Sequence, residues 1–217
     1  MEKLDYGITT AQKTNRGLAT TAAILSYTGK PFPTLIDGQI QQVYGWQSLH
    51  FRKYPQLGWR LLGNCDVPDL ALFPRRFPDL KTVRFYAGLE IPFLHLNLWA
   101  LSWLVRLGLI RRLEKVAPLL LKTSFLFDWL GIANSAFHME LSGKGIDGGN
   151  KTITFELTAR SGDGPYIPCI PSILLTQKLA NGELSVDGAQ PCIGLVTLDE
   201  YLKALGEFDI SWKKSPT

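Results

Sequence analysis

The most constraining feature of this chain is a pair of alternating segments, residues 136–144 and 151–160. In both segments every second side chain is large and apolar, and the side chains between them are mostly polar: Phe137, Met139, Leu141 in the first and Ile153, Phe155, Leu157 in the second. A period of two is typical of strands that place one face on a core and the other toward solvent. The connecting letters GIDGGN are rich in turn-forming residues. The sequence therefore predicts a β-hairpin with one apolar face and one polar face.

The remaining segments divide into further strands and blocks of helix. The segment 45–63 shows no clear period. Strands are expected at 4–10, on both sides of an Asp-Gly turn within 34–44, at 81–89 and at 191–198. Helices are expected from a cap at Thr14 or Asn15 to Tyr27, from a cap at Asp66 to a break at Pro74, at 91–109, 113–130 and 170–180, and at 198–205 behind a Thr197–Glu200 capping box. Because the strands are mostly linked as hairpins and the helices come in blocks, we predict an α+β fold with a mainly antiparallel or mixed sheet, in a single domain over residues 1–217.

Two apolar helices at about 91–130 form a helical insertion in this scheme. They flank Gly108 and a pair of arginines, which indicates an αα-hairpin. The run 91–105 has no formal charge and carries Trp99 and Trp103 on one helical face, but it is shorter than the roughly 20 residues of a spanning helix. Neither helix has a clean polar face, so the pair needs cover from the sheet, a partner chain or lipid. We favour a buried or interface helix, which predicts a homodimer, over membrane contact.

Charge and cysteine content exclude several classes of protein. The net charge is +4 and the basic residues are scattered, whereas nucleic-acid-binding proteins cluster them, so no nucleic-acid partner is expected. Three separated cysteines without a CxxC pair give no support for a zinc site or a disulfide framework, and a reducing, cytoplasmic location follows. His138 and Glu140 share a strand face but lack a third ligand, so no metal site is expected.

The segment "ARSGDGPYIPCIPSILLTQKLANGE" resembles a phosphate-binding loop between a strand and a helix. Gly162 and Gly164 match the first two glycines of G-x-G-x-x-G, but Ile167 stands at the third position. Pro165 and Pro168 remove two N–H donors from the loop. The segment is therefore a poor dinucleotide cradle, and no cofactor-binding residue is expected in this chain.

Polar residues near two helix N-termini are the candidates for ligand binding. Arg160, Asp163 and Tyr166 precede the helix at 170–180, where the helix dipole favours a carboxylate ligand. The alternative is that Asp163 caps a tight turn and Tyr166 packs. Arg16 lies near another helix start, where a cation is locally unfavourable, so it is either held for a partner or ligand or is an ordinary surface arginine. No pattern selects a catalytic residue.

Five blocks of the sequence, taken together, resemble a known protein family. They are "KTNRGLATTAAILSYTGKPF", "CDVPDLALFPRRFP", "VRFYAGLEIPFLHLNLWALSWLVRLGL", "ARSGDGPYIPCIPSILLTQKLANGEL" and "GAQPCIGLVTLDEYL". Together, and in this order, they resemble the C-terminal part of saccharopine dehydrogenase-like oxidoreductases, from about Asp5 to Ile210. The resemblance implies a second, α+β domain that forms the substrate side of the cleft and often the dimer contact, while an NAD(P)-binding Rossmann domain lies elsewhere in a full-length relative.

The same resemblance implies a function and leaves alternatives open. Family chemistry is pyridine-nucleotide-linked oxidation or reduction at a carbon–nitrogen bond, typically of an amino-acid adduct. The chain would then be a fragment, an excised domain or the product of a split gene that is not catalytic alone, with Arg16 and Arg160 for a substrate carboxylate and Asp163 and Tyr166 for polar orientation or proton transfer. The alternatives are a membrane- or protein-docking module built on residues 91–130 and, third, a carrier of an apolar ligand.

Overall fold

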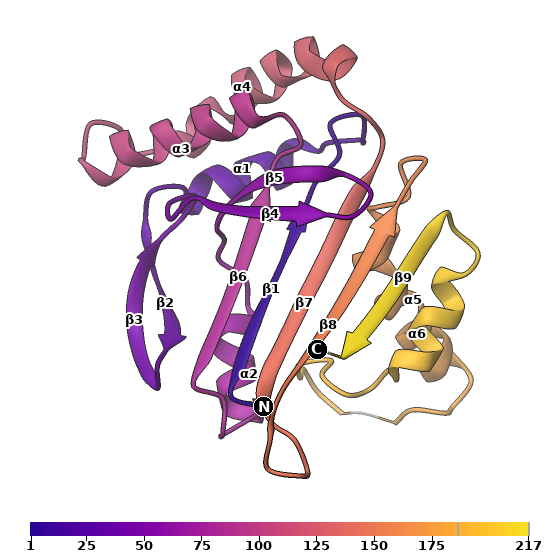
Figure 1. Ribbon diagram of the computed structural model, residues 1–217. Coiled ribbons are helices and arrows are strands. Elements are labelled where there is room, and N and C mark those ends of the chain that lie inside the picture. The colour runs from indigo at the N-terminus through magenta and orange to yellow at the C-terminus, as the bar shows by residue number, and fades with distance from the viewer. Residues whose placement is uncertain (186, 217) are drawn as a thin grey trace.

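A seven-stranded mixed sheet forms the centre of the protein (Figure 1) in the computed structural model, which describes residues 1–185 and 187–216. The strand order is β4-β5-β6-β1-β7-β8-β9. Its strands are β1 (Lys3–Thr9), β4 (His50–Tyr54), β5 (Gly58–Asn64), β6 (Thr82–Gly88), β7 (Ser135–Lys144), β8 (Asn150–Ala159) and β9 (Ile210–Pro216). β1 and β6 run parallel, and the other neighbouring pairs are antiparallel. The predicted α+β class with a mixed sheet is confirmed.

The hairpin β7–β8 has the two faces that its alternation predicts. Phe137 lies opposite Leu157 and His138 lies opposite Glu156, so apolar and polar rows are continued across the pair. β7 also pairs with β1, where Tyr6 meets Met139. The apolar row therefore extends over three central strands on one face of the sheet, and the polar row extends over the opposite face.

Two further hairpins accompany the sheet: one, at residues 31–44, stands at its left in Figure 1, and the other, β4–β5, crosses in front of its upper part. β2 (Pro31–Ile36) and β3 (Gln39–Tyr44) turn at Asp37 and Gly38, as predicted, and form a separate two-stranded sheet. The hairpin β4–β5, in the segment without a clear period, was not predicted. Its outer face exposes 65% of Phe51 and 63% of Trp59, so apolar residues occur on both faces and hide the alternation.

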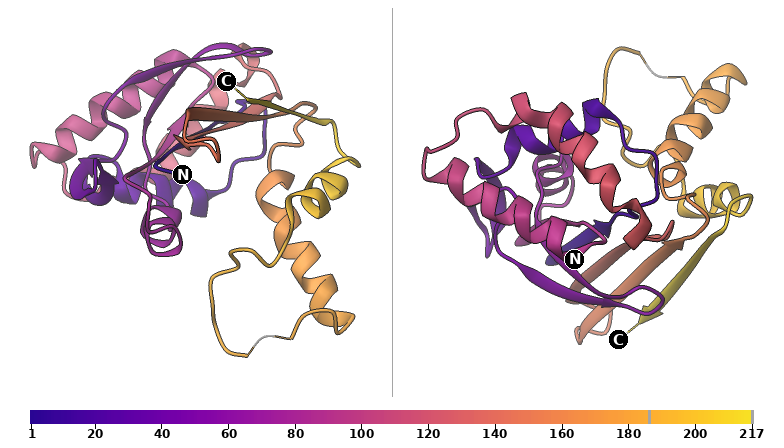
Figure 2. Two further views of the ribbon diagram at one scale, coloured as in Figure 1. Left: turned by 60° about the horizontal axis from the view of Figure 1, so that its bottom comes forward. Right: turned by 90° about the horizontal axis from the view of Figure 1, so that it is seen from above.

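The helices cover the sheet in three groups (Figures 1 and 2). α1 (Leu18–Tyr27) packs with the segment formed by α3 (Pro92–Arg106), η1 (Leu113–Val116), α4 (Ala117–Ser124) and η2 (Phe125–Leu130), which we call the helical layer. α2 (Asp69–Arg76) packs under β6 and β1. α5 (Tyr166–Ala180) and α6 (Leu198–Leu205) cover the apolar face of β7 and β8. Helices occur within residues 91–130 as expected, but the second predicted helix is divided into η1, α4 and η2.

Several expectations about elements and their ends were wrong; among them, α5 begins at Tyr166 and not at about residue 170, so Tyr166 is its first residue. α1 is preceded by Gly17 without a side-chain cap, so Thr14 and Asn15 do not cap it. α2 starts behind Pro68, not Asp66, and Pro74 lies inside it. Residues 191–197 form turns where a strand was expected, while the strand β9 follows α6 instead. β9 escaped detection because neighbouring lysines at 213 and 214 break its apolar pattern. The Thr197–Glu200 capping box of α6 is confirmed.

Gly7 on β1 provides a test of the sheet packing. A Cβ atom at this position would lie 2.6 Å from the Tyr86 carbonyl oxygen and 2.9 Å from His138 Cε1. Because backbone cannot move aside cheaply at the sheet centre, we expect Gly7→Ala to lower the free energy of unfolding by about 1–3 kcal/mol. Gly149→Ala is the control, since its Cβ would meet Asp147 Oδ1 at an ordinary 3.5 Å. Urea unfolding measures both, and equal stability of the two variants would contradict this account of the packing.

Candidate functional site

The candidate residues lie at one end of the sheet, which we call the polar end. The chain leaves β1, β6 and β8 there and enters β7 and β9 there (Figure 1). Arg16 follows β1, Glu90 follows β6, Arg160 follows β8, and Asp209 precedes β9. Strand direction therefore gathers polar residues that are far apart in the sequence.

Arg160 is already bound to groups of this chain. Its Nη1 lies 3.3 Å from Asp209 Oδ1, and its Nη2 donates to Ser211 Oγ at 3.3 Å and to the Gln56 side-chain oxygen. The second Asp209 oxygen accepts a hydrogen bond from Ser161 Oγ at 2.9 Å. The Arg160 guanidinium thus binds a carboxylate, as predicted for a ligand, but this carboxylate is the side chain of Asp209.

Asp163 and Tyr166 lie beside Arg160 and also have internal partners. Asp163 Oδ2 accepts the backbone N–H of Asp209 at 2.8 Å. The ring of Tyr166 stacks on Phe208, with the centroids 4.4 Å apart and the planes 24° apart. The Tyr166 N–H donates to the Asp163 carbonyl at 3.0 Å, so a tight turn leads into α5. Tyr166 therefore packs, as the alternative expects, whereas the Asp163 side chain bonds the distant Asp209 and does not cap the turn.

Arg16 lies apart from the other three candidates, against the helical layer. Its Nη2 is 2.6 Å from Asp128 Oδ1, its Nη1 donates to the Gln12 carbonyl, and its guanidinium sits 4.6 Å from the Phe125 ring centroid. The segment 131–133 separates it from the Arg160 group, because Lys13 N–H bonds the Ile132 carbonyl and Gly162 N–H bonds the Ala133 carbonyl. The structure therefore brings three of the four candidates together.

Glu90 and Arg60 complete the polar end and were not found from the sequence. Glu90 accepts the N–H of Gln12 at 2.7 Å and that of Ile132 at 3.0 Å, and its carboxylate lies 3.9 Å from Arg60 Nη2. Only 9% of the Glu90 side chain and 12% of the Arg60 side chain are exposed. The Glu90 carboxylate is thus mostly buried and is surrounded by three N–H donors. Through them it connects the loop after β1 and the loop before β7 to strand β5. The only available signal was the position of Glu90 at the start of a run without formal charge.

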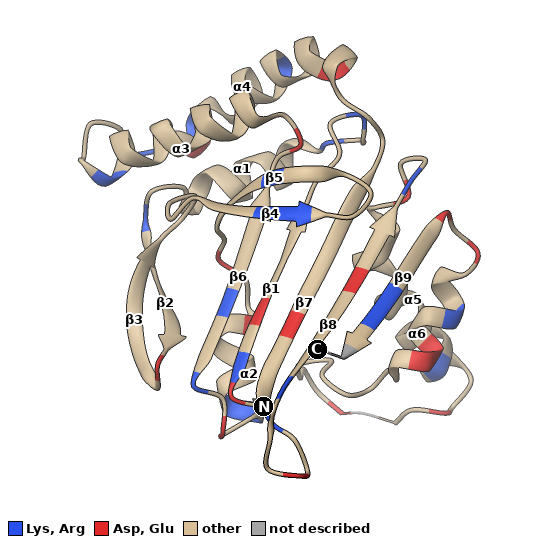
Figure 3. Ribbon diagram, in the orientation of Figure 1, with Lys and Arg blue, Asp and Glu red and all other residues tan. Residues whose placement is uncertain are grey.

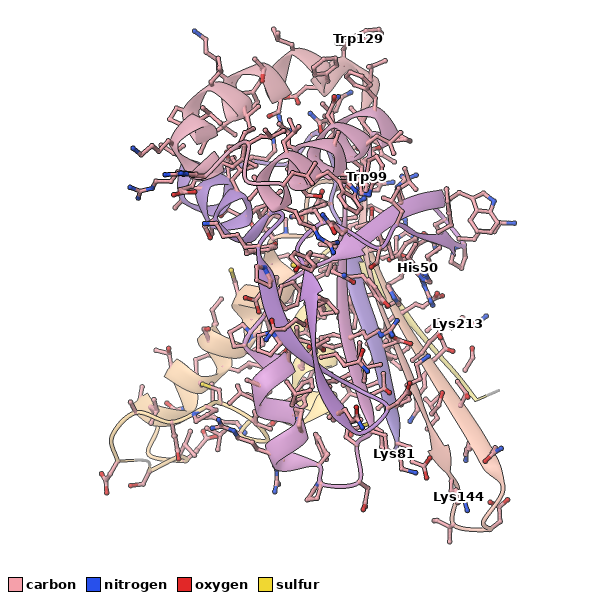
Figure 4. The ribbon with its side chains drawn as sticks, turned by 90° about the vertical axis from the view of Figure 1, so that its left-hand side faces the viewer. His50, Lys81, Trp99, Trp129, Lys144 and Lys213 are labelled. Carbon is pink, nitrogen blue, oxygen red and sulfur yellow. The ribbon has the colours of Figure 1, made fainter. Side chains whose placement is uncertain are left out.

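A second polar cluster lies on the sheet face under β4, and we call it the sheet-face cluster: Arg52, Tyr54, His138, Glu140 and Glu156. Arg52 Nη1 lies 2.6 Å from Glu140 Oε1, and its Nη2 lies 3.4 Å from Glu156 Oε1. Tyr54 Oη and His138 Nδ1 are 2.7 Å apart. In Figure 3 the acidic bands of β7 and β8 lie between basic bands on β6 and β9, and Figure 4 places His50 and Lys213 on this same side.

The inner pair of this cluster is neutral near pH 7. Burial lowers the pKa of His138 to about 3, and the Arg52 and His50 charges act in the same direction. Burial also raises the pKa of Tyr54 well above its usual range. Both side chains are almost fully buried, so no substrate reaches them. The pair pins the β4–β5 hairpin to the sheet and is not an acid–base site open to a ligand.

Comparison with known proteins identifies the fold. No protein-family model and no curated protein sequence matches the chain. Among solved structures, it is similar to the apo form of histidine-tagged saccharopine dehydrogenase (L-Glu forming) from Saccharomyces cerevisiae, with a TM-score of 0.61 and 12% sequence identity. The similarity covers 100% of this chain and 67% of that chain. The protein therefore has a saccharopine dehydrogenase-like fold.

The turn before α5 is the part of the chain that most resembles a nucleotide-binding loop, and its geometry fits a pyrophosphate poorly. At the start of α5, Ser161 and Gly162 adopt positive φ values of 55° and 86°, and Pro165 precedes the first turn without a side-chain cap. The Asp163 carboxylate lies within this turn sequence, bound to the Asp209 N–H, and its negative charge disfavours a pyrophosphate nearby. Within residues 1–185 and 187–216, no group of three or more His, Cys, Asp or Glu side chains is placed to hold a metal ion.

The buried histidines make stability depend on pH. His138 and His95, whose pKa values burial lowers to about 3 and about 4, bind fewer protons in the folded state than in the unfolded state. Their contribution is complete above the unfolded pKa of about 6.5 and is lost as the pH falls toward the folded values. Between pH 6.5 and 5 we expect the free energy of unfolding to fall by up to roughly 1.4 kcal/mol per pH unit for each histidine.

Urea unfolding at several pH values measures this slope. His138→Gln should make the slope shallower, while Lys53→Gln, at an exposed position on the adjacent β4–β5 hairpin, should leave it unchanged. A slope that is identical in the wild type and in His138→Gln would show that this histidine does not carry the effect.

Proposed function

We propose that this chain is the substrate-side domain of a saccharopine dehydrogenase-like, NAD(P)-dependent oxidoreductase that acts at a carbon–nitrogen bond, and that it is not catalytic alone. The observation that carries the proposal is the fold match over the whole chain, combined with the poor fit of its turn at 160–166 to a dinucleotide. The nicotinamide would be held by a separate Rossmann domain, and this domain would hold the substrate against it.

The polar end is the proposed substrate surface. The Arg160–Asp209 pair is partly exposed, at 35% and 48% of the side chains, and an ion pair of this kind contributes only about 0–1 kcal/mol. A substrate carboxylate can therefore replace Asp209 on Arg160 at little cost. Asp163 and Tyr166 stand beside that position, for polar orientation or proton transfer. Arg16 would take a second carboxylate only after release from Asp128, which holds it at 2.6 Å.

Calorimetry tests this assignment with L-glutamate as the probe, because the structural neighbour is an L-Glu-forming enzyme. We expect weak binding, weakened about tenfold in Arg160→Met and strengthened in Asp209→Asn, which removes the internal competitor. Arg111→Met, at an exposed arginine far along the helical layer, is the control. Binding that is insensitive to both Arg160→Met and Asp209→Asn would place the substrate elsewhere.

NADH and NADPH titrations test the other half of the proposal. We expect neither to bind the chain at micromolar concentration. Tight binding of either nucleotide would contradict a separate cofactor domain.

The helical layer is the proposed dimer surface. Its outer side exposes large apolar side chains, each by at least 42%: Phe93, Leu96, Leu107, Leu109, Leu119, Leu126, Trp129 and Leu130. Trp129 is 76% exposed and stands at the outside of the layer in Figure 4, whereas Trp99 lies beneath it. Apolar surface of this extent marks an interaction site in a stable protein. We infer that a second copy of the chain covers it.

Membrane docking is the second candidate for this surface. The segment 91–130 has five basic residues and two acidic ones, and both acidic residues are paired with cations. An apolar surface with excess positive charge fits an anionic lipid surface. No helix among the described residues has the length and apolar character needed to cross a bilayer, so this contact would be interfacial.

A double substitution, Leu126→Ser with Trp129→Ser, separates the two candidates. We expect sedimentation to show a dimer for the wild type and a monomer for the double variant, because the apolar contact is lost. Trp59→Ser, on the equally exposed β4–β5 hairpin, should remain a dimer. Monomeric wild-type protein that co-sediments with anionic vesicles, and loses this binding in the double variant, would support lipid docking instead.

A further inference from the structure

A pocket opens on the apolar face of the sheet, away from both proposed surfaces. Its volume is about 370 Å³, within the roughly 300–1,000 Å³ range of small-molecule sites. Three residues of β7 and three of β8 form its floor: Phe137, Met139, Leu141, Ile153, Phe155 and Leu157. The space exists because α5 and α6 cover only part of this row.

The walls of the pocket come from helices and contribute little polarity. Ile167 in the first turn of α5 and Leu198 and Tyr201 on α6 line it. The Tyr201 hydroxyl donates to the Ile167 carbonyl at 3.0 Å, so it is satisfied within the wall and turns its ring to the pocket. An occupant therefore meets hydrocarbon and aromatic surface on the floor and on the helical side.

Of the described residues that line the pocket, Lys214 on β9 is the one with a charged side chain. It lies opposite Phe155 in the β8–β9 register, on the same face as Trp212, whose ring stacks on Phe155 with a centroid distance of 6.2 Å. Among the described residues, no carboxylate pairs with its ammonium group. Lys213 points to the opposite face, where it lies across from Glu156. One lysine of the pair thus stands at the apolar pocket, and its neighbour stands on the polar face.

We propose that this pocket binds an anionic amphiphile of the fatty-acid class, with the hydrocarbon chain along the β7–β8 floor and the carboxylate on Lys214. Burial of the chain supplies the affinity, because each buried CH₂ strengthens binding by roughly fourfold. The ammonium selects the sign of the head group. The site is independent of the proposed oxidoreductase role, since none of its residues belongs to the polar end.

Calorimetry with sodium decanoate tests the site, with 1-decanol and decyltrimethylammonium as head-group probes. We expect decanoate to bind with one-to-one stoichiometry, and decanol and the cation to bind several-fold more weakly. Lys214→Met should weaken decanoate binding about fivefold and leave decanol unchanged, because a single exposed charge pair is lost. Lys213→Met is the matched control and should bind decanoate as the wild type does.

A second variant locates the hydrocarbon chain. Ile153→Phe adds a ring to the pocket floor and should weaken decanoate and decanol alike, by at least tenfold, because the space is filled. Its urea midpoint and near-UV circular dichroism show whether it folds, and Leu126→Ser on the helical layer controls for binding at other apolar surfaces.

Three outcomes overturn the proposal. They are no binding of decanoate to the wild-type chain, equal binding to the wild type and to a folded Ile153→Phe variant, and equal loss of binding in Lys213→Met and Lys214→Met. The glutamate titration is unaffected by these results, so failure here and failure of the proposed function are distinguishable.

Discussion

The register of the β7–β8 hairpin is the constraint on which the rest of the structure depends. A shift of one residue would move every apolar side chain of both strands to the other face. The observed pairing of Phe137 with Leu157 puts the apolar row under α5 and α6, and it puts His138, Glu140 and Glu156 under β4. Arg52 then holds both carboxylates, and Tyr54 bonds His138, so the β4–β5 hairpin is fixed by the polar row. The apolar core under α5 and α6 and the sheet-face cluster under β4 therefore both follow from the alternation of apolar and polar residues along β7 and β8.

The polar end depends on a different interaction, the mostly buried Glu90 carboxylate. Its bonds to the N–H groups of Gln12 and Ile132 hold together the loops that carry Arg16 and that lead into β7. The Arg160 group is attached to the same region through the Gly162–Ala133 hydrogen bond. The buried and the exposed ion pairs of the polar end therefore have different roles. The Glu90 contacts build the frame, and the exposed Arg160–Asp209 pair at its rim is the part that a ligand can exchange.

The sequence predicted those elements whose local pattern agrees with their place in the fold. The β7–β8 hairpin, the Asp37–Gly38 turn, β1, β6 and the α6 capping box all carry their own signals. β4, β5 and β9 do not, because they are edge or near-edge strands whose partners, not their alternation, define them. Of the four candidate ligand-binding residues, three lie close together in the structure, and Arg16 lies apart from them. Their internal partners Asp209 and Asp128 are 49 and 112 residues away from Arg160 and Arg16, and no local pattern reports such a distance.

β9 shows why position on a strand matters more than residue type. Lysines on an edge strand hinder pairing with other chains, and this role alone would explain both Lys213 and Lys214. It does not explain why one of them stands over hydrocarbon without a carboxylate among the described residues, where an alternating strand would place an apolar side chain. An ammonium group beside an apolar pocket is favourable when an anionic amphiphile binds there. The head group then pairs with the ammonium, and the hydrocarbon chain covers the apolar floor of the pocket. Protection of the edge accounts for Lys213, and for Lys214 we infer the additional role of binding an anionic, chain-bearing ligand.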